Sequence, residues 1–224
     1  MTVENSYLIA DDLSTNGVFP KRGSGRKFIC TFKDGNIRAV ENEILSSKIC
    51  RCFDCRQVLY EESMFDGQKV SKSRIITSVD YSMVSMEAFE IYAANHDIHV
   101  MDFVLKLDAY SYYMMNLLDY LTGNTDRHWG NWGFLVDNRT NQPVRLFDLM
   151  DLNQTFLAYD TPDGANCMTT GNRKMSQREA AVEAVKNIGL NQKDEIKDEW
   201  FKGREKEREM FWCRFGILKE QWKA

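Results

Sequence analysis

The chain has 224 residues, 43% of them hydrophobic, which is enough for one domain of two lobes or for two small domains with a real core. Its 29 basic residues are scattered among 33 acidic ones, for a net charge of −4, and this excludes a protein that binds nucleic acid through a basic surface. No basic, apolar leader begins the chain and no apolar run nears the roughly 18 residues of a membrane span, so we expect a cytoplasmic protein that binds no membrane.

The first informative stretch, residues 14–26, is rich in Gly, Ser and basic residues. This composition suits a loop that covers phosphates, because glycine lets backbone N–H groups approach the anion closely. The glycine spacing matches neither a Walker loop nor a GxGxxG loop, so a flexible surface hairpin is the alternative.

A lysine and a glutamate follow on neighbouring elements. Residues 27–33 predict a strand from their β-branched and aromatic content, and residues 40–50 predict a helix from apolar residues at helical spacing. Lys33 ends the strand, and Glu43 lies in the first turns of the helix. This order suits an ion pair that aims the lysine ammonium at nucleotide phosphates. The alternative is that both side chains are solvated surface charges.

Three of the six cysteines cluster where this helix ends, at Cys50, Cys52 and Cys55. A zinc site needs a fourth ligand at a definite spacing, and the remaining cysteines are isolated. We therefore interpret the three as reduced, half-buried thiols.

Two further strands are expected at residues 57–61 and 69–79. Residues 1–79 then form a predicted N-lobe, a nucleotide-covering sheet with one helix. Residues 79–83 are the expected hinge, where extended backbone offers N–H and C=O groups to an adenine edge. Ser78 and Val79, at its start, are candidate nucleotide contacts.

Residues 80–224 form a predicted helical C-lobe. The expected elements are a helix over 86–94 capped by Ser85, a long helix over 100–121, a loop at 154–178, and helices over 179–189 and 204–218. The loop lies where a substrate or activation segment is expected. The methionines and tyrosines of the long helix are interpreted as core.

The chemistry is concentrated in residues 119–153, which read as helix end, polar loop, strand, turn and strand. Asp126 and Asn131 lie five residues apart in the loop, and Asp148 follows the second strand. Protein kinases place an Asp at the substrate hydroxyl, an Asn five residues on, and a later Asp that binds metal. A helix cap and a turn are the structural alternative for the loop residues.

Each of these residues has a role in phosphoryl transfer. Asp126 would accept or orient the acceptor proton, and Asn131 and Asp148 would bind Mg²⁺ through hard oxygen atoms. Lys33, held by Glu43, would contact the phosphates of ATP. Asp151 is a spare carboxylate, and Arg127 and His128 are expected to brace the loop.

The motifs Asn124–Asn131 and Leu146–Leu149, together with Ser14–Lys21, resemble those of HipA-like serine/threonine kinases. The resemblance extends over about residues 7–218. It implies Asp126 as the catalytic aspartate, Asn131 and Asp148 as magnesium ligands and Lys33 as the nucleotide lysine. It also implies a phosphate loop through Ser14, Gly17 and Lys21, with Ser14 a candidate for autophosphorylation, and an antitoxin-like or regulatory protein as partner.

We therefore expect an α+β, two-lobed protein-kinase-like fold with a small β-rich N-lobe and a mainly helical C-lobe. The expected activity is ATP- and Mg²⁺-dependent phosphorylation of a protein on Ser or Thr. The alternatives are a pseudokinase that binds nucleotide without turnover, and a phosphoinositide or small-molecule kinase, since the Asp-Arg-His-x-x-Asn loop also resembles phosphoinositide kinases. The sequence does not name the acceptor.

Overall fold

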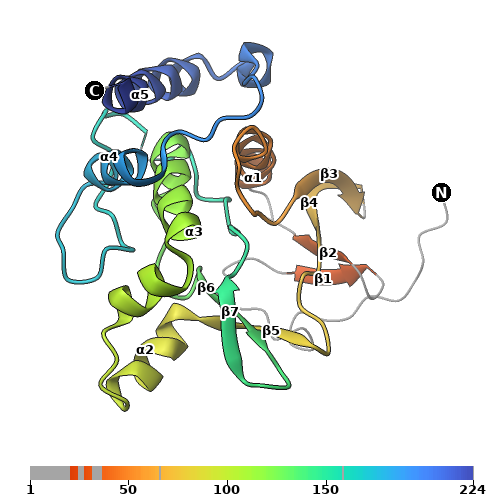
Figure 1. The fold of residues 1–224 in the computed structure, drawn as a ribbon. Helices are drawn as coiled ribbons and strands as arrows, with labels where there is room; N and C mark the ends of the chain where they lie inside the picture. Colours follow the sequence, from red (N-terminus) through yellow and green to blue (C-terminus); the bar gives the residue numbers. More distant parts are fainter. Residues whose placement is uncertain (1–20, 25–27, 32–36, 66, 158, 224) are drawn as a thin grey trace.

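The computed structural model describes residues 37–65, 67–157 and 159–223, together with the backbone of residues 21–24 and 28–31. Its elements, in chain order (Figure 1), are β1 (Lys21–Ser24), β2 (Phe28–Thr31), α1 (Ile37–Cys50), β3 (Tyr60–Phe65), β4 (Gln68–Arg74), β5 (Tyr81–Ser85), α2 (Met86–Ala94), α3 (Val100–Thr122), β6 (Gly133–Asp137), β7 (Gln142–Leu146), α4 (Gln177–Ile188), the 3-10 helix η2 (Asp198–Phe201) and α5 (Glu205–Lys223).

The first sheet is antiparallel, with strand order β1-β2-β4-β3, and α1 packs against β4 and β3 (Figure 1). In the β2–β4 ladder, Thr31 is paired with Ser71. The Ser71 hydroxyl donates a hydrogen bond to the carboxylate of Glu43 on α1. This contact joins the helix to the middle of the sheet.

The second sheet has the order β5-β6-β7 and carries the hairpin that follows the polar loop. Gly133 begins β6 opposite Ser85 of β5. A Cβ atom at residue 133 would lie 2.1 Å from the carbonyl oxygen of Val84, so the two strands can approach this closely only with glycine there.

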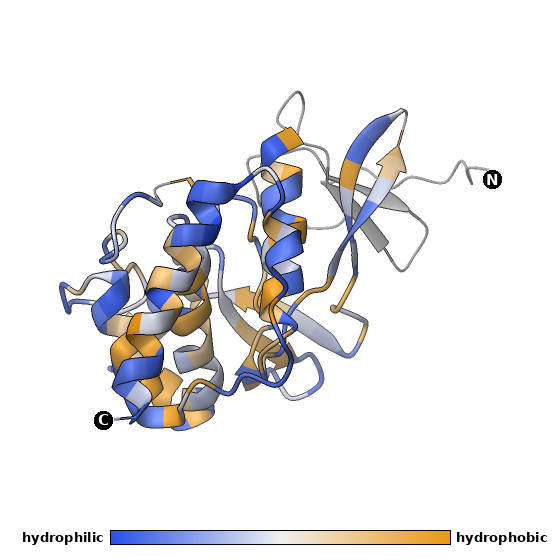
Figure 2. Cartoon of the chain, turned by 90° about the horizontal axis from the view of Figure 1, so that it is seen from above, coloured by the Kyte–Doolittle hydropathy of each residue, from blue (hydrophilic) through white to orange (hydrophobic). Residues whose placement is uncertain are grey.

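The long helix α3 forms the centre of the core and packs against α4 and α5. Hydrophobic and hydrophilic residues alternate along these helices, as expected for helices with one buried face (Figure 2). α3 ends at Gly123, whose φ of 62° is left-handed and whose Cβ position lies 2.3 Å from the Tyr159 ring. Both the conformation and the close ring favour glycine, and the chain leaves the helix here toward the polar loop.

Most predicted elements are present, with shifted ends. Ser85 caps α2 as expected, because its side chain accepts a hydrogen bond from the N–H of Ala88. The strand predicted over 69–79 ends at Arg74, and β7 ends at Leu146, before Asp148. Residues 21–24 were predicted as loop but form β1, because they pair with β2. The 3-10 helix η2 was not predicted.

The predicted lobe division at residues 79 and 80 falls in the connection between β4 and β5, which belong to different sheets, and it stays a prediction. Among the described residues, no helix has the length and apolar character needed to cross a membrane. Cys55 is half-buried as expected, whereas Cys50 and Cys52 are fully buried, and none of the three is in a disulfide with a described residue.

Candidate active site

The polar loop after α3 is organised by Asn124, which is buried. Its side-chain amide donates to Asp119 on α3 (3.0 Å), and its side-chain oxygen accepts from the backbone N–H of Asp126 (3.2 Å). Its carbonyl oxygen accepts from the side chain of Gln177 (2.6 Å). An asparagine can hold a turn in this way because its side chain replaces backbone hydrogen bonds. The position of Asp126 is therefore set before any ligand binds.

The carboxylate of Asp126 makes no hydrogen bond or ion pair with any described residue, although the group is half-buried. Burial raises the pKa of this carboxyl, the charge of His128 lowers it, and the charge of Asp151 raises it. Asp126 does not cap α3, because Gly123 ends that helix. The cap alternative is thus wrong, and the carboxylate has free acceptor capacity.

Asn131 is held by the backbone of the same loop. Its side-chain N–H₂ donates to the carbonyl of Asp126 (2.8 Å), and its backbone N–H donates to the carbonyl of His128 (2.9 Å). The first bond identifies the other amide atom as the oxygen, and no described residue donates to it. This oxygen is of the type that Mg²⁺ prefers.

Arg127 is buried between the loop and its surroundings, with 3% of its side chain exposed. Its guanidinium donates to both carboxylate oxygens of Asp119 (2.8 and 3.1 Å). It also donates to the carbonyls of Asn131 (2.8 Å) and Met150 (2.6 Å). Burial, the largest single effect, lowers the pKa of Arg127, but the charge and hydrogen bonds of Asp119 together with the charges of Asp151 and Tyr60 raise it, and the pKa is raised overall. The expectation that Arg127 braces the loop agrees with these contacts.

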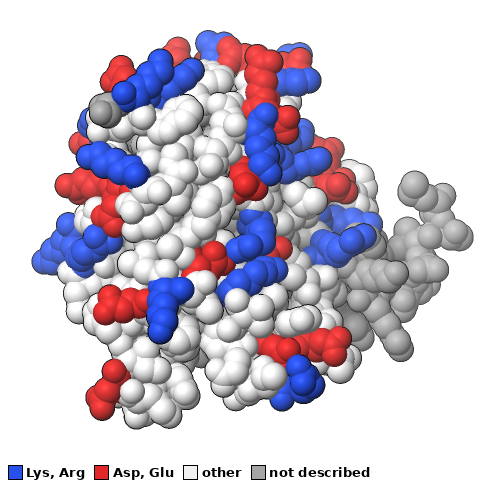
Figure 3. All heavy atoms as spheres, viewed as in Figure 1, with Lys and Arg blue, Asp and Glu red and all other residues white. Residues whose placement is uncertain are grey.

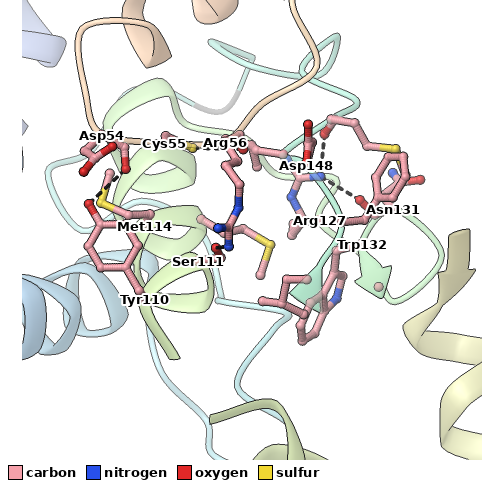
Figure 4. A pocket seen from close by; sticks show the side chains of 16 residues that line it. Asp54, Cys55, Arg56, Tyr110, Ser111, Met114, Arg127, Asn131, Trp132 and Asp148 are labelled. Atoms are coloured by element: carbon pink, nitrogen blue, oxygen red, sulfur yellow. Dashed lines mark hydrogen bonds between the residues drawn. The ribbon is translucent and has the colours of Figure 1, made fainter. Parts of the chain in front are cut away.

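Asp148 lies just beyond β7 and is paired with Arg145, whose guanidinium is 2.5 Å from the carboxylate. It lines a cavity of about 220 Å³ that also reaches Asn131 and Arg127. Figure 4 shows Asp148, Arg127 and Asn131 on one side of this cavity and Tyr110 and Met114 on the other. Asp148 is not among the charges that shift the pKa of Asp126. Its carboxylate therefore belongs to the cavity side of the loop.

Asp151, three residues later, has a left-handed backbone with φ of 55°. Its N–H donates to the hydroxyl of Tyr60 on β3 (3.1 Å), and its carboxylate accepts from the side chain of Asn153. Its charge contributes to the raised pKa values of Asp126 and Tyr60, in each case after burial as the largest cause. Asp151, unlike Asp148, is thus among the charges that shift the pKa of Asp126.

Sequence reasoning regarded Asp151 as spare. The sequence feature that could have pointed to Asp151 is its position three residues after Asp148, since both aspartates follow the end of a predicted strand. That spacing does not say which one faces Asp126, because residues three apart in an irregular segment have no fixed relative direction. Asp151 has the left-handed backbone of the two, a conformation that aspartate is one of the few residue types to tolerate.

Glu43 is buried on α1, beside Ser71 and near Tyr60, whose pKa it helps to raise after the larger effect of burial. Its predicted partner Lys33 lies outside the described residues, as do Ser14 and Gly17. For Lys21, only the backbone is described, in β1. The Lys33–Glu43 pair and the phosphate loop stay predictions.

The predicted hinge residues Ser78 and Val79 lie at the surface. Val79 is 92% exposed, and its carbonyl accepts a hydrogen bond from the side chain of Asn138 (2.9 Å). The Ser78 hydroxyl accepts from the N–H groups of Asp80 and Tyr81. Since β5 is an edge strand of its sheet, half of its backbone groups point away from β6. Adenine recognition by this edge stays a prediction.

The segment after Asp151 is tied to α1 by Thr155, which is fully buried. The Asn42 side chain donates to the Thr155 carbonyl (2.6 Å), and the Ser46 hydroxyl donates to the Thr155 hydroxyl (2.7 Å). The helix that carries Glu43 is thereby linked to the loop that carries Asp151.

Side chains from α3, from α5 and from the polar loop hold the predicted substrate segment, residues 154–178. Tyr120 donates to the carbonyl of Pro162 (2.7 Å), the Trp129 indole donates to that of Met168 (3.0 Å), and Arg214 donates to that of Thr161 (2.8 Å). On the face in Figure 3, basic and acidic side chains are interspersed without an extended area of one sign.

The donor set fits a hard divalent cation that is shared with phosphates. Within the described residues, no three His, Cys, Asp or Glu side chains gather to hold a metal by themselves. In nucleotide sites, Mg²⁺ is usually held by one or two carboxylates together with phosphate oxygens and water. The free amide oxygen of Asn131 and a carboxylate from residues 148–151 supply such a partial set.

The fold is similar to that of a kinase of known structure. No protein-family model matches the sequence, and no curated protein matches it. Among solved structures, the chain is similar to a proinflammatory kinase of Helicobacter pylori, CtkA, with a TM-score of 0.69 at 13% sequence identity. The match covers 94% of this chain and 91% of that chain. The predicted α+β, two-lobed kinase-like fold is therefore confirmed.

Proposed function

We propose that this protein is an ATP- and Mg²⁺-dependent kinase that phosphorylates Ser or Thr of a protein. One observation carries the proposal. On a kinase-like fold, the half-buried carboxylate of Asp126 has no described partner, while Asn131 is hydrogen-bonded to its backbone and Asp151 is close enough to shift its pKa. The pKa of Asp126 is raised, mainly by burial, and groups with perturbed pKa values cluster at active sites.

In the proposed reaction, Asp126 orients the acceptor hydroxyl and takes its proton as the phosphoryl group is transferred. Asn131 and a carboxylate of the 148–151 segment would hold Mg²⁺. Asp151 is favoured for this role because it is near Asp126, and Asp148 is the residue that the sequence predicts. Bound Mg²⁺ neutralises charge on the phosphate oxygens.

The remaining assignments come from the sequence. Lys33, held by Glu43, would contact the α- and β-phosphates, and Ser78 and Val79 would contact adenine. Ser14, Gly17 and Lys21 would cover the phosphates, with Ser14 as a site of autophosphorylation. The HipA-like type rests on the motifs alone, since no family model matches, and an antitoxin-like or regulatory partner is proposed on the same ground.

A nucleotide-binding module without turnover is the second candidate. The ion pair between Asp148 and Arg145 favours it, because a carboxylate already neutralised by a guanidinium is a poorer metal ligand. The carboxylate of Asp126, which has no partner among the described residues, favours an active enzyme instead. Only phosphoryl transfer separates the two candidates.

The test is transfer of labelled phosphate from ATP with Mg²⁺, to the protein itself and to cell extract. We expect Asp126→Asn to lower transfer by about 10²–10⁴-fold, the usual contribution of an acid–base group. Asp97→Asn is the matched control, since Asp97 is an exposed aspartate in the turn between α2 and α3. Equal transfer by wild type and Asp126→Asn would exclude the proposed role. Label that enters only the lipid or small-molecule fraction would exclude a protein acceptor.

A further inference from the structure

One buried side chain contacts both loops that carry the proposed metal ligands. Arg127 donates to the carbonyl of Asn131 in the first loop and to the carbonyl of Met150, directly before Asp151, in the second. Within the described residues, the bond to Met150 is the only hydrogen bond that joins residues 124–131 to residues 147–153. The dashed lines in Figure 4 mark the two contacts beside the cavity.

The guanidinium of Arg127 is held in place by α3, which is separate from the two loops. Both oxygens of Asp119, on the last turns of α3, accept from the guanidinium, and the Asp119 side chain is 6% exposed. Asp119 also accepts from Asn124, which positions Asp126. A rigid helix therefore sets the place of the guanidinium, and the guanidinium sets the places of two loop carbonyls.

We infer that Arg127 is a positioning residue that sets the spacing between Asn131 and Asp151, and thereby the affinity of the site for the divalent cation that accompanies the nucleotide. The inference rests on the proposed function and extends it to a residue that touches neither metal nor substrate. Groups that orient metal ligands without binding the metal commonly change metal affinity by about 10–100-fold.

Arginine suits this role for a geometric reason. The four acceptor atoms belong to Asp119, Asn131 and Met150, and a planar guanidinium offers five N–H donors in a fixed fork that can meet all of them. A lysine ammonium is a compact point charge on a flexible stem, with three donors and no fork. Lysine can keep the pairing with Asp119, but it cannot hold both carbonyls at the same distances.

The informative variant is Arg127→Lys. Removing the charge altogether leaves the buried carboxylate of Asp119 without its partner, which strongly destabilises a fold and hides any effect on the metal. The matched control is Arg214→Lys. Arg214 is also fully buried and also donates to two carbonyls, those of Tyr120 and Thr161, but these lie on α3 and in the substrate segment, away from the two loops.

The experiment titrates Mn²⁺ into the full chain with a non-hydrolysable ATP analogue and follows free Mn²⁺ by electron paramagnetic resonance. We expect Arg127→Lys to raise the Mn²⁺ concentration at half-saturation by about tenfold or more. Arg214→Lys should stay within about twofold of wild type, even if both variants lower the melting temperature. Affinity for the analogue in EDTA should be unchanged in Arg127→Lys, because the inference concerns the metal alone.

The outcomes separate the inference from the proposed function. If the wild type shows no nucleotide-dependent Mn²⁺ binding, the proposed function fails. If the wild type binds Mn²⁺ and Arg127→Lys binds it as tightly as Arg214→Lys does, the inference is overturned. Should Arg127→Lys not fold, the double variant Arg127→Gln with Asp119→Asn removes both charges together, so that neither is left buried without its partner, and it takes away the guanidinium that contacts the two carbonyls. Wild-type Mn²⁺ affinity in that variant would equally overturn the inference.

Discussion

The side-chain amide of Asn131 donates a hydrogen bond of 2.8 Å to the backbone carbonyl of Asp126, five residues earlier. The bond closes the polar loop on itself and orients the free amide oxygen of Asn131. It also ties the proposed metal ligand to the backbone of the proposed base. A displacement of either residue therefore moves the other, and the loop acts as one unit.

Asp151→Asn should weaken metal-dependent nucleotide binding more than Asp148→Asn. Asp151 is close to Asp126, whereas Asp148 is paired with Arg145 on the cavity side. We expect Asp151→Asn to lower the affinity for an ATP analogue with Mg²⁺ by at least about tenfold. Loss of a residue that only orients a metal ligand already costs about 10–100-fold, so loss of a ligand should cost at least as much. Asp148→Asn should change it little. Calorimetry with Mg²⁺ and with EDTA measures both, and the reverse ranking would return the metal role to Asp148.

Asp126→Asn should stabilise the protein at neutral pH while it removes activity. The pKa of Asp126 is raised in the folded state, mainly by burial, so the folded protein binds this proton more tightly than the unfolded chain does. The ionised carboxylate therefore destabilises the fold, fully so above the folded pKa. This destabilisation decreases as the pH falls through the folded pKa, and it is gone below the unfolded pKa, where the group is protonated in both states. Thermal unfolding should show a higher melting temperature for the variant at pH 7.

The same comparison at low pH is the control. There the two proteins should converge, because wild-type Asp126 is then neutral. A variant that melts below wild type at pH 7 would mean that Asp126 has a stabilising partner and is not free to act on an acceptor.

Thr155→Val should lower the free energy of unfolding by about 1–3 kcal/mol, because the buried hydroxyl of Ser46 loses its acceptor. The substitution keeps the side-chain shape. Urea denaturation measures the change, and Thr77→Val, at an exposed threonine, is the control. If Ser46→Ala with Thr155→Val costs the sum of the two single changes, the two hydroxyls do not interact.

Gly133→Ala should be strongly destabilising, by about 1–3 kcal/mol or more, since its Cβ would overlap the carbonyl of Val84 across the β5–β6 ladder. Gly216→Ala is the matched control. Nothing lies within 4 Å of its Cβ position in α5, so alanine should stabilise that helix by about 0.5–1 kcal/mol. Chemical denaturation of both variants checks the prediction, and a neutral Gly133→Ala would mean that the two strands can separate without cost.

The local pattern of apolar residues was sufficient to predict most of the helices. Helical spacing of apolar residues predicted α1, α3 and α4, because a helix that packs on a core must repeat its apolar face every three to four residues. Strand ends were less accurate, and β1 was missed, since a short strand of polar residues exists only through its pairing with β2. The end of β7 at Leu146 is likewise set by its partner strand.

The sequence by itself placed Asp126 and Asn131 within reach of each other, because they lie five residues apart in one short loop. Only the tertiary structure distinguished the two later aspartates from each other. Asp148 and Asp151 are three residues apart, but the left-handed turn at Asp151 and the pairing of Asp148 with Arg145 direct the two carboxylates differently. The sequence also could not predict that Arg127 contacts Asp119 on α3 and Met150 beyond β7, because contacts between distant segments depend on how those segments pack.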